Sequence, residues 1–215
     1  MRVIKKILKA IVYAFAWIFS LIFNNFFVSA IKQLARNVAS INFKRRLKKH
    51  GKRVHVGTGN VFEGLKKVTV GDDFSSGNGL WLGTYSEYGG EKYNPQITIG
   101  NNVSFSRFCH VGAIGSIEIK DNVLFGSNVL INDHSHGKIE VSDMPRNEMP
   151  LVSKGGIVIE KNVWVGDNVC ILAGVTIGEN SIIGANSVVT KSIPANCVAV
   201  GSPAQVVKTM ENPNG

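Results

Sequence analysis

Two histidines and an aspartate lie close together in the stretch NVLINDHSHGKIE, residues 128–140. His134 and His136 are two of the five histidines in the chain, and Asp133 directly precedes the first of them. A neutral imidazole can take the proton of an attacking hydroxyl, and a nearby carboxylate can orient the imidazole ring. The same residue types can also bind a metal ion or simply occupy a surface loop, so their role depends on the elements that position them.

A metal site would need a third ligand beside the histidine pair. His110 could supply it, because three imidazoles can hold a zinc ion. The three cysteines, Cys109, Cys170 and Cys197, are odd in number and widely spaced, and the chain has no CxxC motif. This pattern predicts small packed side chains in a reducing compartment rather than a disulfide framework.

A six-residue repeat governs the sequence from about residue 54 onward. In the C-terminal half, a large apolar residue recurs every six positions, and a smaller apolar or serine residue follows four positions after each. The first set is Ile159, Val165, Ile171, Ile177, Ile183 and Val189, and the second set is Val163, Val169, Val175, Ser181, Ser187 and Ile193. The same register appears in IGNNVS (99–104) and IKDNVLFGSNVL (119–130).

A period of six fits a short strand followed by a turn, with asparagine and glycine at corners that accept positive φ. Three such units close a coil of about eighteen residues, and stacked coils pair as parallel strands. We therefore predict an all-β fold, a parallel β-helix preceded by N-terminal α-helices. The histidines lie in a loop at about residues 132–154 that interrupts the repeat, and such loops commonly carry function.

Residues 54–208 resemble the hexapeptide-repeat acyltransferases, which form left-handed parallel β-helices. The run NVWVGDNVCILAGVTIGENSIIGANSVVTKSIPANCVAVGSPAQVV (162–207) is highly specific for this family. Within the family, the sequence is most similar to the maltose, galactoside and nodulation O-acetyltransferases and to their polysaccharide-modifying relatives. The resemblance implies a homotrimer that uses acetyl-CoA as co-substrate and needs no metal.

The resemblance also implies a general base in the histidine loop. Counted without gaps from the GSNV hexad, the family's histidine falls on His136, with His134 as the alternative. An imidazole with its ordinary pKa near 6.5 is mostly neutral at pH 7 and can deprotonate a sugar hydroxyl that attacks the acetyl-CoA thioester. Asp133 is the candidate that orients the imidazole.

Other site residues are implied only by their positions in the family pattern. The expected acetyl-CoA-binding residues are Trp164, Asp167, Ala185, Thr190 and Lys191, along the pantetheine groove, and Lys208, at a CoA phosphate. Ser106 stands where the family has an asparagine that meets the acceptor hydroxyl, which leaves the acceptor open. Arg146 lies in DMPRNEMPL (143–151), a segment similar to the family's continuation of the loop, and we expect it to bind substrate.

The N-terminal segment, residues 1–53, lies outside the resemblance and is basic. The formal net charge of +9 divides into +13 over this segment and −4 over the rest, which is not the pattern of a nucleic-acid-binding domain. Residues 10–31 are uncharged and mostly apolar, and residues 32–53 resemble a second, amphipathic helix. Basic residues on both flanks favour a helix lying in the membrane plane, although a spanning helix and a helix packed on the protein remain alternatives.

Together these features predict an O-acetyltransferase that acts on a saccharide hydroxyl, possibly lipid-linked, in the biosynthesis of O-antigen, capsule or exopolysaccharide. We expect a membrane-associating segment (1–53), an acyltransferase domain (54–208) and a flexible tail (209–215). Because acetyl-CoA is cytoplasmic, the domain should face the cytoplasm at the inner or plasma membrane. Alternative acceptors are soluble small molecules such as antibiotics. A γ-type carbonic anhydrase is disfavoured because WVGDNVCILAGVTIG lacks that group's histidine, and a non-catalytic scaffold is the remaining alternative.

Overall fold

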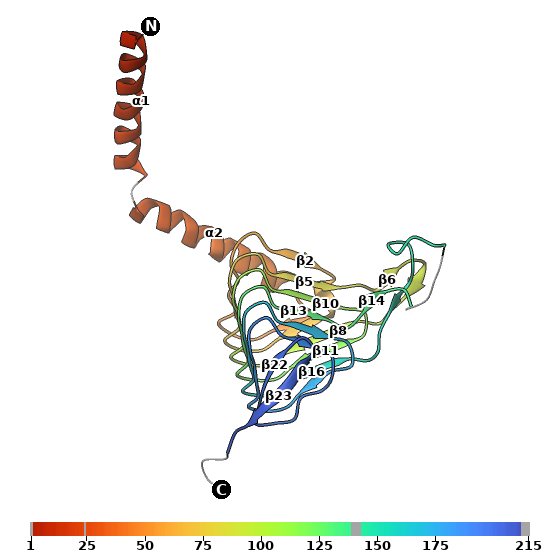
Figure 1. Cartoon of the computed structure of the whole chain (residues 1–215). Coiled ribbons are helices and arrows are strands. Elements are labelled where there is room, and N and C mark those ends of the chain that lie inside the picture. The colour runs from red at the N-terminus through yellow and green to blue at the C-terminus, as the bar shows by residue number, and fades with distance from the viewer. Residues whose placement is uncertain (1, 24, 139–142, 212–215) are drawn as a thin grey trace. The chain divides into compact units, whose positions relative to one another are not determined.

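The computed structural model describes residues 2–23, 25–138 and 143–211 and divides into two compact units, Met1–Val38 and Ala39–Gly215. The first unit contains helix α1 (Arg2–Ile22) and the first part of helix α2 (Asn25–Arg46) (Figure 1). The predicted division between residues 53 and 54 stays a prediction. The described chain ends at residue 211, so the end of the expected tail, residues 212–215, lies outside the described residues.

The apolar segment 10–31 does not form one continuous helix. Helix α1 ends at Ile22 and α2 begins at Asn25, at the Asn24–Asn25 pair, and asparagine has a low helix propensity. The apolar side chains of α1 are exposed, including Ile11, Phe15 and Ile18. Within the described residues no single helix has both the length and the hydropathy of a membrane span, whereas the bent pair α1 and α2 passes that test jointly on length and composition.

The C-terminal turns of α2 belong to the second unit and cap its core. Phe43 is fully buried, with its ring centroid 4.7 Å from that of Phe62 and 6.0 Å from that of Phe74. Ser40 Oγ accepts a 3.0 Å hydrogen bond from the Val56 amide. The second helix ends at Arg46 rather than near residue 53, and its C-terminal turns cover the first coil of the β-structure.

The second unit is built from three large sheets, whose strands are parallel except for β23, and the chain passes from one sheet to the next (Figure 1). The first sheet contains β1 (Lys49–His50), β3 (Val68–Val70), β8 (Gln96–Ile99), β11 (Ser116–Ile119), β16 (Ile157–Ile159) and β19 (Thr176–Ile177). The second sheet contains β2 (Val61–Glu63), β5 (Trp81–Thr84), β10 (His110–Ala113), β13 (Leu130–Asn132), β18 (Cys170–Leu172) and β21 (Val188–Val189). The third sheet contains β4 (Ser75–Ser76), β9 (Ser104–Phe105), β12 (Leu124–Phe125), β17 (Trp164–Val165), β20 (Ile182–Ile183), β22 (Cys197–Gly201) and β23 (Ala204–Thr209).

Successive coils stack in register, so that the chain forms a parallel β-helix. For example, Val111 of β10 pairs with Leu82 of β5 and with Ile131 of β13. A short 3₁₀ helix, Leu65–Lys67, precedes β3, and strand β23 pairs antiparallel with β22 at the C-terminal end. The sequence-based prediction of stacked parallel strands is confirmed.

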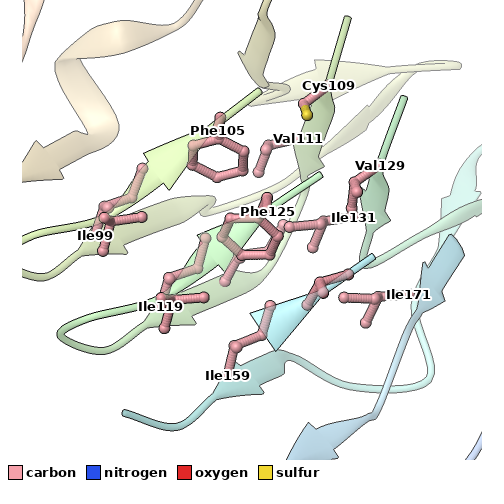
Figure 2. Packing of buried hydrophobic residues seen from close by; sticks show 14 of the residues in the cluster. Ile99, Phe105, Cys109, Val111, Ile119, Phe125, Val129, Ile131, Ile159 and Ile171 are labelled. Carbon is pink, nitrogen blue, oxygen red and sulfur yellow. The ribbon is translucent and has the colours of Figure 1, made fainter. Parts of the chain in front are cut away.

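The hydrophobic core fills the inside of the β-helix (Figure 2). The six large apolar positions of the repeat, from Ile159 to Val189, are all 0% exposed. Ser181 and Ser187, which occupy the smaller inward position, are also 0% exposed. Their hydroxyls are satisfied, because Ser181 Oγ donates to the Pro194 carbonyl at 2.7 Å and Ser187 Oγ accepts from the Gly201 amide at 3.1 Å. The predicted six-residue register is therefore correct.

Asparagines occupy the corners with positive φ, as the repeat predicted. Their side chains form ladders along the coils, in which Asn128 donates to Asn168 at 3.0 Å and Asn168 donates to Asn186 at 3.1 Å. A second ladder runs through Asn102, Asn122, Asn162, Asn180 and Asn196. Each amide thus fixes the corner of one coil to the corner of the next.

Two excursions leave the β-helix and contact each other (Figure 1). One is the predicted histidine loop, in which β14 (Ser135–His136) pairs antiparallel with β15 (Leu151–Val152); residues 139–142 lie outside the described residues. The other is a hairpin of β6 (Glu87–Tyr88) and β7 (Glu91–Lys92), which the repeat analysis did not identify. The Tyr88 hydroxyl donates to the Asn147 carbonyl at 2.7 Å, and the Tyr93 hydroxyl donates to the Leu151 carbonyl at 2.9 Å.

Candidate active site

Asp133 is fully buried and links two coils directly beside the histidine pair. Its carboxylate accepts the backbone N–H groups of Ile114 at 2.9 Å and Gly115 at 2.8 Å. The carboxylate also lies 3.0 Å from His134 Nδ1, so His134 donates to it through that nitrogen. The side chain of His134 is only 7% exposed, and the partner of Asp133 is this imidazole rather than that of His136.

His136 lies on β14 with its side chain exposed. Two tyrosine rings, at and just before the β6–β7 hairpin, pack against the two imidazoles. The ring of Tyr85 packs edge-on against His134, with centroids 5.6 Å apart, and the ring of Tyr88 packs edge-on against His136, with centroids 5.3 Å apart. The hairpin and the histidine loop therefore position the pair together.

A cavity of about 470 Å³ opens on one side of the histidine pair. It is lined by Asn132, His134, Ser135, His136, Gly137, Lys138, Arg146, Val152, Lys154, Leu172, Ala173 and Thr190. Three of these side chains are cationic, and no carboxylate is among the described residues that line the cavity. Arg146 is held by a 2.7 Å hydrogen bond from its guanidinium to the Lys138 carbonyl.

A second cavity of about 220 Å³ also borders the pair. It is lined by Tyr85, Tyr88, His110, Asn132, His134, His136 and Leu151. Asn132, His134 and His136 thus line both cavities and form the boundary between them. An imidazole at this boundary can reach a molecule in either cavity.

The structure brings together only part of the predicted site. Asp133, His134, His136, Arg146 and Thr190 lie at the two cavities or in contact with their walls. The other predicted residues, Ser106, Trp164, Asp167, Ala185, Lys191 and Lys208, line neither cavity of the single chain. Trp164 is on β17 and Lys208 on β23, both in the third sheet, and the Asp167 carboxylate accepts the Ser127 amide at 2.6 Å.

Several site residues were not identified as such from the sequence. Tyr85 and Tyr88 come from TYSEYGGEKYNP (84–95), whose tyrosines and Gly-Gly pair are a signal that this stretch also departs from the repeat. Asn132 sits at the end of β13, directly before Asp133. His110 was considered only as a metal ligand, yet within the described residues no three His, Cys, Asp or Glu side chains are arranged to hold a metal ion.

Comparison with known proteins agrees with this architecture. The family model "Bacterial transferase hexapeptide (six repeats)" matches residues 156–191. The putative lipopolysaccharide biosynthesis O-acetyl transferase WbbJ of Escherichia coli K12 is 35% identical over 146 residues, which cover 66% of this chain and 71% of that protein.

Two solved structures extend the comparison. A maltose O-acetyltransferase from Clostridium difficile 630 has 30% sequence identity and a TM-score of 0.51, covering 79% of this chain and 73% of that one. A galactoside acetyltransferase in complex with coenzyme A has 28% identity and a TM-score of 0.52, covering 79% of this chain and 68% of that one. With its six-residue repeat, its three-sheet β-helix and its histidine loop, the chain belongs to the hexapeptide-repeat acetyltransferases, a family of enzymes.

Proposed function

We propose that this enzyme transfers an acetyl group from acetyl-CoA to a saccharide hydroxyl, with His136 as the general base. The observation that carries this proposal is the pair of cavities that meet at Asn132, His134 and His136. A group-transfer enzyme must bring two substrates to one reacting centre, and two chambers that share an imidazole boundary suit that task.

The transfer requires one proton to move at the moment of attack. The thioester supplies an activated acetyl group, whose C–S bond breaks as a C–O bond forms to the saccharide oxygen. His136 takes the hydroxyl proton and returns it to the sulfur leaving group, so that atoms and charges balance. His136 is exposed at the boundary, whereas His134 is tied to Asp133 and nearly buried, which favours His136 as the group that exchanges the proton.

The larger cavity suits the donor. Lys138, Arg146 and Lys154 give it a positive charge, and acetyl-CoA is a polyanion. Thr190, at a position where the family pattern implies pantetheine binding, lines the same cavity. The coenzyme A complex of the galactoside acetyltransferase supports the same co-substrate for this chain.

The acceptor is a saccharide of a surface polysaccharide. The name of the Escherichia coli relative, which refers to lipopolysaccharide biosynthesis, supports this class over a soluble antibiotic. An acceptor carried on a lipid also accounts for the exposed apolar side chains of α1 beside Lys5, Lys6 and Lys9. In this proposal the segment 1–53 holds the protein at the cytoplasmic face of the membrane through the exposed apolar side chains of α1, and the β-helix faces the cytoplasm.

A homotrimer of left-handed β-helices completes the proposal. Leu124 and Trp164 pair in register on the third sheet and are 48% and 51% exposed, although both are large and apolar. A neighbouring subunit would cover them, and it would bring its own Trp164, Asp167 and Ala185 to the site of the first.

Purified full-length protein provides the test. Incubation with isotopically labelled acetyl-CoA and neutral glycosides should give a labelled, base-labile ester on the saccharide, detected by mass spectrometry. Label that stays on CoA with every saccharide, but moves to a soluble amine or an antibiotic, would replace the proposed acceptor class.

A further inference from the structure

Asn132 carries a buried hydrogen-bond acceptor that the protein does not use. Its Nδ2 donates to the His134 carbonyl at 3.0 Å, which fixes the orientation of the amide. Its Oδ1 is buried and has no hydrogen-bond partner among the described residues. An unsatisfied buried acceptor is unfavourable, so the position favours a ligand that supplies the missing donor.

Two glycines in register lie close to polar side chains of the small cavity, Gly112 beside this oxygen and Gly83 beside the Tyr85 hydroxyl. Gly83 of β5 pairs with Gly112 of β10, and Gly112 pairs with Asn132 of β13. A Cβ on Gly112 would lie 2.8 Å from Asn132 Oδ1 and 3.3 Å from His110 Nε2. A Cβ on Gly83 would lie 3.0 Å from the Tyr85 hydroxyl oxygen.

Backbone conformation does not explain these two glycines, because neither has a positive φ. At Gly126 the reason is packing between coils, since a Cβ there would meet the Asp167 amide nitrogen at 2.6 Å. At Gly83 and Gly112 the nearest atoms are instead side-chain groups of the small cavity and its walls. A Cβ at either glycine would therefore crowd the polar ends of Asn132 or Tyr85, two of the side chains that line the small cavity, and we call this cavity the trough.

Aromatic rings line the trough, and Trp81 packs behind two of them. Trp81 stacks on His110 with ring centroids 5.1 Å apart and planes 12° apart, and Trp81 Nε1 donates to the Tyr85 hydroxyl at 3.2 Å. The ring of Tyr88, which also lines the trough, packs edge-on against His136. No Asp, Glu, Lys or Arg is among the described residues that line the small cavity, in contrast to the three cations of the larger one.

The pKa values of two groups at the trough, His110 and Tyr85, are shifted so that their neutral forms are favoured. Burial lowers the pKa of His110, and the neighbouring His134 lowers it further. Burial raises the pKa of the Tyr85 hydroxyl, and the charge of Glu63 adds to the rise. Flat aromatic faces combined with neutral donors and acceptors match the C–H faces and hydroxyls of a sugar ring, whereas Glu63, which pairs with Gly83 in the next coil, repels an anionic sugar.

We propose that this trough is the acceptor subsite and that it takes an uncharged pyranose ring, with one hydroxyl donating to Asn132 Oδ1. This inference rests on the proposed acetyl transfer and adds which saccharides are accepted and by which residues. Asn132 and the two glycines then determine specificity for the acceptor, while the cationic cavity beyond the histidine pair serves the donor.

The test separates binding from chemistry. Full-length protein is titrated with methyl glycosides of neutral hexoses and with methyl glucuronide, and tryptophan fluorescence is recorded for wild type and for Trp81→Phe. Neutral glycosides should change the emission of wild type and not that of Trp81→Phe, and the glucuronide should bind at least about tenfold more weakly. Binding without acetyl transfer would refute the proposed function and leave the subsite intact.

Steady-state kinetics with thiol detection supply the second arm. Gly112→Ala, which places a Cβ 2.8 Å from Asn132 Oδ1, and Asn132→Ala, which removes that oxygen, should each raise the saccharide KM by about tenfold and leave the acetyl-CoA KM within about twofold. Leu172→Ala, at the next position of the same ladder but in the larger cavity, should do the reverse. Transfer with an unchanged saccharide KM in Gly112→Ala and Asn132→Ala, or absence of neutral-glycoside binding to wild type, overturns the subsite.

Discussion

Replacement of Asp133 by alanine should destabilise the protein far more than replacement of any exposed aspartate in the β-helix. Asp133 is 0% exposed and satisfies the backbone amides of Ile114 and Gly115 as well as the His134 ring. An orphaned buried donor costs about 1–3 kcal/mol, and Asp133→Ala orphans two backbone donors, of which the one at Gly115 is only partly buried, besides removing the partner of the His134 ring. We therefore expect a loss of about 2–4 kcal/mol in the free energy of unfolding.

Asp121 provides a matched control in the same fold. Its carboxylate also links two coils, accepting the Asn101 amide at 2.6 Å, but it is exposed, so water can replace it. Asp121→Ala should therefore change the free energy of unfolding by no more than about 0.5 kcal/mol. Asp133→Asn should fall between the two, because one amide oxygen can still accept from one of the backbone donors.

The assay is urea unfolding followed by circular dichroism, with all variants at one protein concentration because an oligomer's apparent stability depends on it. Equal midpoints for Asp133→Ala and Asp121→Ala would refute the reasoning. They would mean that the Ile114 and Gly115 amides find other partners and that Asp133 does not hold this part of the site together.

Three further perturbations test other parts of the structure. Ile183→Asp places a carboxylate at a position that is 0% exposed and should cost several kcal/mol of unfolding free energy. Asn186→Asp should have only a small effect on stability, because the new carboxylate can still accept from Asn168 Nδ2. Similar melting temperatures for the two variants would contradict the six-residue register. Burial and His134 lower the folded-state pKa of His110, so the protein should be most stable above the unfolded pKa near 6.5 and lose stability as pH falls below it. His110→Gln should therefore lessen the difference in melting temperature between pH 8 and pH 5.5, with His55→Gln, at an exposed position, as the control. An unchanged difference in His110→Gln would count against His110 as the origin of the pH dependence. Full-length protein should float with anionic liposomes and resist high salt, whereas a chain starting at Ala39, the first residue of the second unit, should stay at the bottom of the gradient. Sedimentation of the full-length protein with both anionic and neutral liposomes would contradict membrane binding by the N-terminal segment.

The repeat could be read from the sequence because its cause is local. Each inward position, such as Ile177 or Ile183, lies six residues from the next, and each corner asparagine tolerates positive φ without help from distant parts of the chain. The N-terminal helices were less predictable in detail. The apolar run suggested one helix over 10–31, but α1 ends at Ile22 and α2 begins at Asn25, and the low helix propensity of asparagine favours a break there.

The site depends on contacts that spacing does not reveal. Tyr88 and Asn147, whose contact joins the hairpin to the histidine loop, are 59 residues apart in the chain. The sequence also offered Asp133 two histidines, one and three residues away, with no means of choosing between them. The choice follows from burial, because Asp133 is turned inward between two backbone amides and reaches only the imidazole of His134.

The assignment of the general base is the central claim about function, and turnover of two histidine variants tests it most directly. His136→Ala should lower kcat by at least about a hundredfold while the Kd for acetyl-CoA, measured by calorimetry, stays nearly unchanged, because the base acts in the chemical step. His134→Ala should cost much less in kcat. A large loss in His134→Ala with a small one in His136→Ala would contradict the account and make His134, oriented by Asp133, the base.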